Sequence, residues 1–426
     1  MVDDAHVRAH MEFLASDALA GRGSATEYEH IAATYIASEL RQYGLAPAGD
    51  KAEAGVPASY LQRVPLPPSR SSAPPLLQAG KQQWEHGKQI AVIELSATNV
   101  QGPLQKWDGA GPIQRGAFVL VRLREDGPSV REQLIQPLRG GAAAVLVADA
   151  AQIQARFKSA AGELPQIRRR TLIFLNPEAS KEISALAEGE AVTLSAPTSA
   201  KDIRSTWNVV AKLEGSGPES VLLSAHLDHL GTDPSRAGDN IFNGADDDAS
   251  GVTAVLELAR ILGQGPKPRR TVYFVLFGSE ETGGQGASFF LEHPPIALPQ
   301  FAAALEFEMI GRADSAVARD QLWLTGYDRS DLGPELAKHG ARLVADPHPA
   351  ENFFQRSDNF AMAKRGIVAH TVSSFGLHAE YHQPNDDLAH IDFKHMVEAI
   401  QSMAAPVRWL ADSDFKPKWK RPVLAD

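Results

Sequence analysis

The chain has no cysteine among its 426 residues. This absence excludes disulfide bonds, zinc–thiolate sites and a cysteine nucleophile, so any metal ligands must be histidine, aspartate or glutamate. No apolar run approaches the roughly 20 residues that a membrane-spanning helix needs. The start, Met-Val-Asp-Asp-Ala-His, lacks the basic and apolar stretches of an export signal. We therefore expect no membrane span and no signal peptide in this chain.

Basic clusters are also scarce. The formal net charge is -10, and no long block of lysine and arginine occurs. This balance argues against a nucleic-acid partner or an anionic membrane surface. With 43% hydrophobic and 22% charged residues, the chain has the composition of a globular protein that buries a large core. Its length predicts two or more domains.

The first 200 residues change in character along their length. Apolar residues at helical spacing predict helices over His6 to Ala18 and Glu29 to Tyr43. The proline-rich stretch Pro65 to Pro75 predicts a connection. Beyond it, short β-branched runs such as Ala117 to Arg122 and Ala144 to Val147 predict strands. We therefore expect a boundary between two domains after the prolines.

Two of these runs flank a helix that is predicted over Val130 to Arg139, before Gly140 and Gly141. They read Arg115-Gly-Ala-Phe-Val-Leu-Val-Arg122 and Gly141-Ala-Ala-Ala-Val-Leu-Val-Ala-Asp149. This pattern resembles the protease-associated domain, an insert found in several secreted peptidases. The alternative is an ordinary β-rich insertion within one large domain. We expect residues 1–85 to begin a peptidase domain, 86–200 to form the insert, and 201–426 to complete the peptidase domain.

From Trp207 onward, predicted strands alternate with predicted helices. Apolar strands are predicted at Val209 to Leu213, Val221 to Ser224, Thr271 to Phe277 and Ala302 to Phe307, and a helix at Val252 to Leu262. Strands that are apolar on both faces predict an α/β fold, with a mostly parallel central sheet covered by helices on both faces. Ligands of such sheets bind outside the carboxyl ends of the strands.

Five segments in this region carry metal-ligand chemistry. They are His226-Leu-Asp228, Gly244-Ala-Asp-Asp-Asp-Ala-Ser-Gly251, Glu280-Glu281, Glu306-Phe-Glu308-Met and Tyr381-His382-Gln-Pro384. Two imidazoles and three carboxylates, one of them able to bridge, are what two zinc ions need for three protein ligands each and a shared water. The set therefore predicts a hydrolase.

Some of these residues have a simpler interpretation. His226 and Asp228 alone would be compatible with a surface pair, although an acid two positions on also suits the orientation of a ligating imidazole. Asp246 or Asp248 could serve only to start a helix, where aspartate is favoured.

The remaining segments favour a functional role more strongly. Glu280 and Glu281 follow the apolar run Val-Tyr-Phe-Val-Leu-Phe-Gly, and adjacent side chains there point to different sides. One can bind metal while the other takes a proton from water. Glu308 ends an apolar strand, with Glu306 as a second candidate. His382 lies among turn-forming residues. The other histidines are expected at the surface or behind the ligands: His229, His378, His390 and His395.

Taken together, the segments resemble the co-catalytic di-zinc aminopeptidase family, in the same order over residues 207–395. That family includes secreted bacterial leucine aminopeptidases, glutamate carboxypeptidase and glutaminyl cyclase. The resemblance implies the zinc exopeptidase fold and two zinc ions per chain. It makes His226 and Glu308 ligands of one zinc, Glu281 and His382 ligands of the other, and Asp247 the bridging carboxylate.

The resemblance also implies roles for three helpers. Glu280 becomes the general base, Asp228 the orienting partner of His226, and Tyr381 a donor to the tetrahedral oxyanion. Many family members have aspartate where Glu308 stands, and the longer side chain could alter the grip on zinc. The stretch Ser357-Asp358-Asn359 resembles a family Ser-Asp-His stretch without its histidine, so we expect no metal role for it.

The expected function is that of an aminopeptidase that removes amino-terminal residues from peptides. The alternatives are a glutaminyl cyclase-like acyltransferase, a carboxypeptidase or dipeptidase on the same site, and, least favoured, a receptor-like protein without catalysis. The resemblance favours a secreted or periplasmic location. A monomer is favoured, and the partner is a peptide substrate.

Overall fold

The computed structural model describes residues 1–51, 57–66, 74–94, 99–124, 130–148, 171–196, 204–234 and 236–423. The chain divides into two compact units, Met1–Val64 with Ser205–Asp426, and Pro65–Arg204. The second unit begins ahead of the expected boundary at residue 86, because β3 (Leu76–Ala79) pairs with β4 (Gln82–Glu85) and with β10 (Ala191–Ser195). Parts of the expected connection and insert lie outside the described residues.

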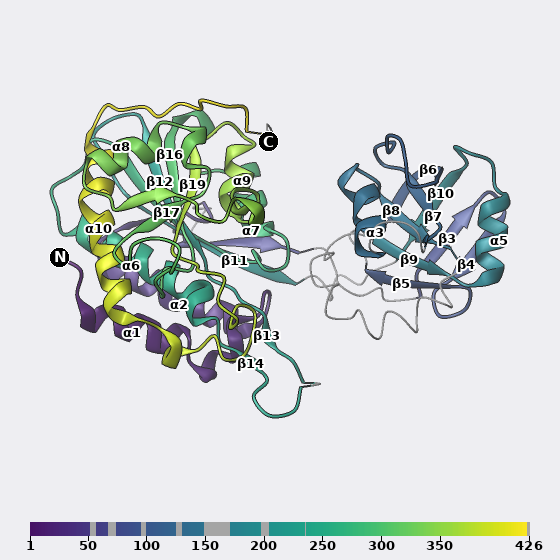
Figure 1. The fold of residues 1–426 in the computed structure, drawn as a ribbon, viewed down its shortest axis with the longest axis horizontal. Coiled ribbons are helices and arrows are strands. Elements are labelled where there is room, and N and C mark those ends of the chain that lie inside the picture. The colour runs from purple at the N-terminus through teal and green to yellow at the C-terminus, as the bar shows by residue number, and fades with distance from the viewer. Residues whose placement is uncertain are drawn as a thin grey trace. The chain divides into compact units, whose positions relative to one another are not determined.

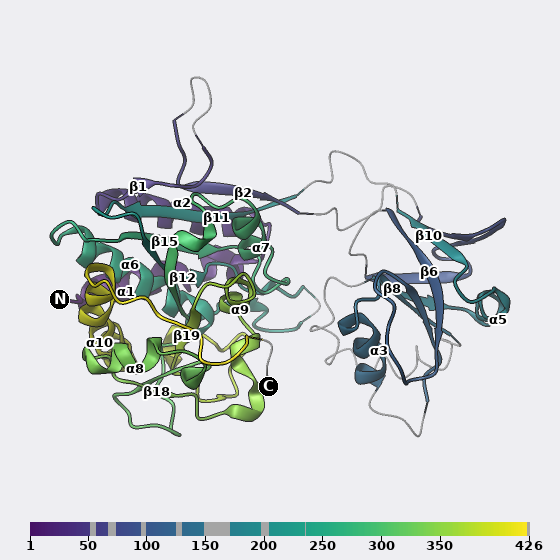
Figure 2. The ribbon, with the colours of Figure 1, turned by 90° about the horizontal axis from the view of Figure 1, so that it is seen from above.

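The first unit is built on a nine-stranded sheet. Its order is β1-β11-β15-β12-β16-β19-β17-β18, with β2 paired to β11. The strands are β1 (Ala46–Pro47), β2 (Leu61–Pro65), β11 (Ser205–Leu213), β12 (Ser220–His226), β15 (Thr271–Phe277), β16 (Phe301–Phe307), β17 (Leu322–Leu324), β18 (Leu343–Ala345) and β19 (Ala369–Ser373). Figure 2 shows β1, β2 and β11 together at one edge.

The sheet is mixed, and the expectation of a mostly parallel sheet holds only for its centre. Strands β15, β12, β16 and β19 are parallel neighbours. Strand β11 runs antiparallel to β15, and β17 antiparallel to β19. The short connection over residues 214–219 reverses the chain between β11 and β12, whereas parallel neighbours need longer crossovers.

Helices cover both faces of this sheet, as expected. On one face Val221, Leu223 and Ala225 share a core with α1 (Asp4–Leu14), α2 (Glu27–Gln42), α6 (Gly251–Gly263), α8 (Leu332–Lys338) and α10 (Phe393–Asp412). On the other face Leu222 and Val275 pack with α7 (Gln285–Glu292) and α9 (Asp358–Ala363). The alternation follows from the two-residue period of a strand. Figure 1 shows these helices around the sheet.

Side chains at the helix starts explain where the amino-terminal helices lie. Asp3 accepts a hydrogen bond from the Ala5 N–H before α1, and Thr26 accepts one from the Glu29 N–H before α2. The helix that was expected to reach Ala18 ends at Leu14, because Ser16 accepts the Ala18 N–H and begins a new turn.

The second unit has its own sheet and core. The sheet order is β4-β3-β10-β6-β7-β8-β9-β5. Besides β3, β4 and β10, the described part of this unit contains β5 (Ile90–Glu94), β6 (Asn99–Trp107), β7 (Phe118–Val121), α3 (Val130–Arg139), β8 (Ala144–Val147), β9 (Thr171–Leu175) and α5 (Pro177–Ala185). Phe118 and Leu146 face one core and Val119 and Val147 the other, so both faces of the sheet are covered.

Within the described ranges, none of the helices combines the length and the apolar character that crossing a bilayer requires.

Candidate metal centre

Four parallel strands of the first unit end at one edge of its sheet. His226, the last residue of β12, is in register with Phe277, the last residue of β15. Phe307 at the end of β16 is in register with Val372 of β19. Glu280 follows β15 after two residues, and Glu308 follows β16 directly. The prediction that three chemically active segments share one sheet edge is therefore confirmed.

Asp247 lies between the segments that meet at this edge. It belongs to the turn Ala245–Ser250, directly before α6. Its Oδ1 lies 3.0 Å from His226 Nε2, and its Oδ2 lies 3.1 Å from His382 Nε2. The Asp247 N–H donates to Asp386 Oδ2 over 3.1 Å, which holds the turn in place. The two carboxylate oxygens of Asp247 thus face two different imidazoles.

The donor atoms form two groups that share Asp247. One group contains His226, Asp247 and Glu308, and the other contains His229, Asp247 and Glu281; in each, the possible ligand atoms lie within 4.8 Å of one another. Two groups joined by one carboxylate are the arrangement that a bridged pair of metal ions requires.

His226 is oriented by a backbone group and not by the Asp228 carboxylate. His226 Nδ1 lies 3.1 Å from the Asp228 carbonyl oxygen, to which it can donate, and 4.0 Å from the carboxylate. The Asp228 carboxylate accepts the Ser24 hydroxyl over 2.5 Å and the Glu280 N–H over 2.9 Å. Asp228 thus contacts the imidazole through its main chain, while its side chain contacts the Glu280 segment, and its role as the orienting partner of His226 stays a prediction.

The second group contains a histidine that the sequence interpretation placed elsewhere. Glu281 Oε1 lies 3.2 Å from His382 Nε2 and 2.8 Å from His229 Nδ1. The His229 side chain is fully buried, so of its two expected positions the surface is excluded, and the ring lies beside the donor atoms of Glu281 and Asp247. The spacing His-Leu-Asp-His was the available signal, because it puts a second imidazole just beyond the strand end.

The neighbouring acids Asp246 and Asp248 accept main-chain hydrogen bonds, and of the two only Asp248 accepts one at the start of a helix, as the simpler interpretation had it. Asp248 Oδ1 accepts the N–H groups of Gly251 (2.9 Å) and Met309 (3.1 Å). Asp246 Oδ1 accepts the Gly311 N–H over 2.7 Å, and its Oδ2 lies 2.9 Å from His378 Nε2. These two acids therefore fix the turn that carries the shared carboxylate.

Glu306, the second candidate at the end of β16, lies outside both groups. Its Oε2 accepts the Asn359 N–H over 2.6 Å and the Thr371 hydroxyl over 3.2 Å. Of the two glutamates, only Glu308 offers its carboxylate to the cluster around Asp247.

The buried carboxylates of the centre have pKa values that differ from their ordinary values, and each shift has a cause in the surrounding groups. Burial alone would raise the pKa of Asp247, but hydrogen bonds with His226 and His382 hold it well below its ordinary value. Burial and the charge of Asp247 would raise the pKa of Glu281, yet the charge of His382 lowers it to about 2. At Glu308, burial and the nearby charge of Glu306 raise the pKa to about 8.

These carboxylates fit a site for divalent cations. The Asp247 and Glu281 side chains are only 3% and 6% exposed. Within the described part of the chain, their ion-pair partners are imidazoles, and neither lysine nor arginine is among them. Buried charges are normally paired or bound to metal. The imidazole and carboxylate donors, without thiols, suit zinc.

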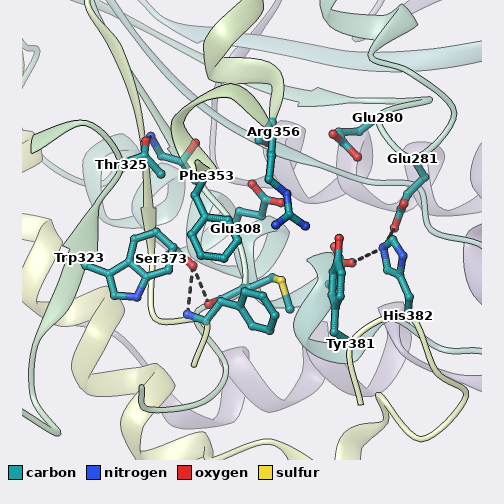
Figure 3. A pocket seen from close by; sticks show the side chains of 15 residues that line it. Glu280, Glu281, Glu308, Trp323, Thr325, Phe353, Arg356, Ser373, Tyr381 and His382 are labelled. Atoms are coloured by element: carbon teal, nitrogen blue, oxygen red, sulfur yellow. Dashed lines mark hydrogen bonds and ion pairs between the residues drawn. The ribbon is translucent and has the colours of Figure 1, made fainter. Parts of the chain in front are cut away.

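A pocket of about 500 Å³ opens beside these donors (Figure 3). Its wall includes Glu280, Glu281, Glu308, Tyr381 and His382 together with the aromatic side chains of Trp323, Phe353 and Phe375. The Tyr381 ring stacks on His382 with centroids 3.9 Å apart. Burial and the charge of Asp247 raise the Tyr381 pKa well above its ordinary value, so its hydroxyl keeps its proton.

Arg356 points into the same pocket (Figure 3). Its guanidinium carbon lies 4.9 Å from the centroid of the Phe353 ring, and its NH1 lies 3.2 Å from Glu351 Oε2. A cation therefore stands in the same wall as the acidic and aromatic side chains. It was not predicted, because it comes from a loop whose position depends on the folded sheet.

A model of peptidase family M28 matches residues 208–407 of this chain. The sequence is 24% identical to aminopeptidase YwaD of Bacillus subtilis over 208 residues, which are 47% of this chain and 43% of YwaD. It is 37% identical to the probable lipoprotein aminopeptidase LpqL of Mycobacterium tuberculosis over 123 residues, which are 27% of this chain and 23% of LpqL. The matches thus span less than half the length of these curated relatives.

Solved structures show the same fold. An aminopeptidase from Aneurinibacillus superimposes with a TM-score of 0.56 at 18% identity, over 97% of this chain and 95% of that chain. A zinc aminopeptidase from Bacillus subtilis, BSAP, gives a TM-score of 0.56 at 16% identity, over 97% of this chain and 96% of that chain. The peptidase family resemblance that the sequence suggested is confirmed, together with a mixed α/β fold.

Proposed function

We propose that the chain is a zinc-dependent aminopeptidase that hydrolyses the amino-terminal peptide bond of peptide substrates. The observation that carries this proposal is the position of Asp247, whose two oxygens face imidazoles of two donor groups at distances of 3.0 and 3.1 Å. His226 and Glu308 would hold one zinc ion, and Glu281 and His382 the other, with Asp247 as the bridge. The aminopeptidase names of the relatives support the substrate class.

The residues around the centre can perform the remaining chemistry. When bound, the two ions lower the pKa of a water and polarise the scissile carbonyl. Glu280 stands at the pocket wall, with its backbone N–H fixed 2.9 Å from Asp228 Oδ1. It would take the proton from the attacking water and deliver it to the leaving amine.

Tyr381 would stabilise the tetrahedral intermediate. Its hydroxyl retains its proton in this buried position, so it can donate a hydrogen bond to the developing oxyanion. Its stacking on His382 limits the orientations of the ring. The aromatic residues Trp323, Phe353 and Phe375 exclude water from the substrate side chain.

A panel of substrates, assayed with and without a chelator, tests the proposal. It contains aminoacyl anilides, amino-terminally blocked peptides, dipeptides and peptides that begin with glutamine. We expect chelator-sensitive cleavage of the anilides and none of the blocked peptides. Cleavage of blocked peptides from the carboxyl end would indicate a carboxypeptidase, restriction to dipeptides a dipeptidase, and pyroglutamate formation without hydrolysis a cyclase. Any of these three would refute the aminopeptidase assignment.

We also propose that the second unit is a protease-associated domain and that the protein acts, as a monomer, outside the cytoplasm. The strands β7 and β8 on either side of α3 support the first part. The description of the relative LpqL as a probable lipoprotein supports the second. Cell fractionation of the natural producer tests the location, and recovery of the protein only with the cytoplasm would contradict it.

A further inference from the structure

His229 is a buried imidazole with no role in the mechanism above. Its side chain is fully buried, and among the described residues neither ring nitrogen has a hydrogen-bond partner. Its N–H on the main chain donates to the Arg22 carbonyl over 3.2 Å, which places the ring against Gly244. A Cβ at Gly244 would lie 2.5 Å from His229 Cγ, so only glycine allows this approach. The fold thus accommodates a buried imidazole whose polar neighbours are carboxylates of the donor groups.

The ring is directed at the second donor group. His229 Nδ1 lies 2.8 Å from Glu281 Oε1 and 3.8 Å from Asp247 Oδ2. His229 Nδ1 and Glu281 Oε1 are therefore paired as an imidazole and a carboxylate. Both are electron-pair donors, and with Asp247 they lie close enough together to bind one metal ion.

The distances among four side chains lie within about 0.5 Å of those expected for a tetrahedral zinc site. Zinc binds nitrogen and oxygen ligands at about 2.0–2.2 Å, so two ligand atoms of a tetrahedral site lie about 3.3–3.6 Å apart. His382 Nε2 lies 3.1 Å from Asp247 Oδ2 and 3.2 Å from Glu281 Oε1. The two distances from His229 Nδ1, 2.8 and 3.8 Å, fall on either side of the ideal range.

We propose that His229 is a fourth protein ligand of the ion that Glu281 and His382 hold. The inference rests on the proposed zinc function and adds to it. The site would then have four side-chain donors, namely Asp247 Oδ2, Glu281 Oε1, His229 Nδ1 and His382 Nε2. The other site keeps three: His226, Asp247 and Glu308. Four protein donors are typical of structural zinc sites, whereas three donors leave a position open for water or substrate.

The two ions therefore differ in how tightly they are held. The first equivalent of zinc would enter the site with four donors. The second equivalent enters the site with three donors, where water and substrate have access. Removal of the His229 ligand abolishes this difference.

The test replaces His229 with glutamine in the full chain and measures metal binding. The glutamine side chain has a volume close to that of histidine. In the His229→Gln variant it can still donate a hydrogen bond to Glu281, but it is a poor zinc ligand. Because the loss of a residue that only supports a ligand costs 10–100-fold in metal affinity, we expect the loss of a direct ligand to exceed about 100-fold. Zinc affinities are obtained by competition with a chromophoric chelator, and circular dichroism of the metal-free variant verifies folding.

Cobalt substitution gives a second measurement that does not depend on activity. The visible spectrum of the first cobalt equivalent should change in His229→Gln, since one imidazole leaves its coordination sphere. His293→Gln, at an exposed histidine, is the matched control and should leave affinity and spectrum unchanged. A loss below 100-fold or an unchanged cobalt spectrum overturns the inference.

The experiment also separates the inference from the function on which it rests. If the wild-type chain binds no zinc, the proposed function fails as well. If the wild type binds two ions and His229→Gln binds both with wild-type affinity, only the fourth ligand is refuted. Glu308→Gln serves as the comparison, because it should weaken the other ion and leave the first cobalt spectrum intact.

Discussion

Arg22→Lys should destabilise the first unit strongly, although it preserves the charge. The Arg22 side chain is 1% exposed and donates four hydrogen bonds to main-chain carbonyls. They go to Leu14, to Leu227 (3.0 Å), to Asn243 (2.7 Å) and to Gly244 (3.0 Å). The guanidinium therefore ties the end of α1 to the two segments that carry the metal-site residues.

The size of the effect follows from the number of bonds. Five N–H donors in a planar fork reach four separate carbonyls, whereas the ammonium of lysine is a single point with three donors. We expect lysine to keep two of the four bonds at most. A hydrogen bond to a charged group contributes about 1.5–3 kcal/mol, so the loss of two costs about 3–6 kcal/mol. The carbonyls left without donors lie in the interior, which adds to the cost.

The free energy of unfolding measures this loss. Urea denaturation, followed by circular dichroism in the presence of a chelator, avoids the contribution that bound metal makes to stability. We expect the urea midpoint of unfolding to fall, while the slope of the free energy of unfolding against urea concentration stays unchanged. Arg8→Lys is the control, because Arg8 also belongs to the amino-terminal region but is 47% exposed and pairs with Asp4; its effect should stay within about 0.5 kcal/mol. A loss below 1 kcal/mol for Arg22→Lys would refute the reasoning.

The other predictions concern the centre and one buried histidine. Glu280→Gln should keep two zinc ions by elemental analysis and lose about 10²–10⁴-fold in kcat; near-normal turnover would remove Glu280 from the mechanism. Asp247→Asn should lose zinc from both sites, and two retained ions would contradict the bridge. Burial lowers the pKa of His370 to about 4, whereas an unfolded histidine has about 6.5. Between pH 6.5 and 4, the free energy of unfolding of the wild-type chain should therefore fall by about 3 kcal/mol more than that of the His370→Gln variant.

The sign of this last effect follows from the hydrogen bonds of His370. Nδ1–H donates to the Thr325 carbonyl over 2.7 Å, and Nε2 accepts the Ser330 hydroxyl at 2.7 Å, so the folded state holds the neutral ring. Above pH 6.5 the ring is neutral in both states and its contribution is complete. Below pH 6.5 the unfolded chain takes up the proton first, which favours unfolding until the folded ring titrates near pH 4. Urea midpoints of both proteins across this range measure the difference, and parallel curves would contradict the assignment.

Apolar strands in the middle of the sheet could be predicted closely from the sequence. Thr271–Phe277 was predicted to the residue, because every side chain of this strand is buried. The helix Val130–Arg139 was also predicted to the residue, because Gly140 and Gly141 follow it. Five donor residues were expected together, and the structure places the other four near the Asp247 carboxylate.

Features that depend on loops could not be predicted in this way. His229 is directed at Glu281 because its main chain is tied to Arg22 and its ring lies against Gly244. No periodicity in the sequence reports such contacts between distant segments. The same holds for Asp228, whose carbonyl, and not its carboxylate, contacts His226. A pattern of residue types identifies a set of candidate ligands. The hydrogen bonds of the main chain determine which atom of each residue contacts the site.

The interruption of the first unit has a consequence for synthesis on the ribosome. Strand β2 pairs with β11, yet the whole of Pro65–Arg204 is translated between them. At about 5–20 residues per second, the partner of β2 emerges on the order of ten seconds later. During that interval the apolar sides of α1 and α2 have no sheet to cover, and the inserted unit is completed before β11 is made. Nascent chains should therefore need protection at their amino-terminal helices until β11 and the strands after it leave the exit tunnel.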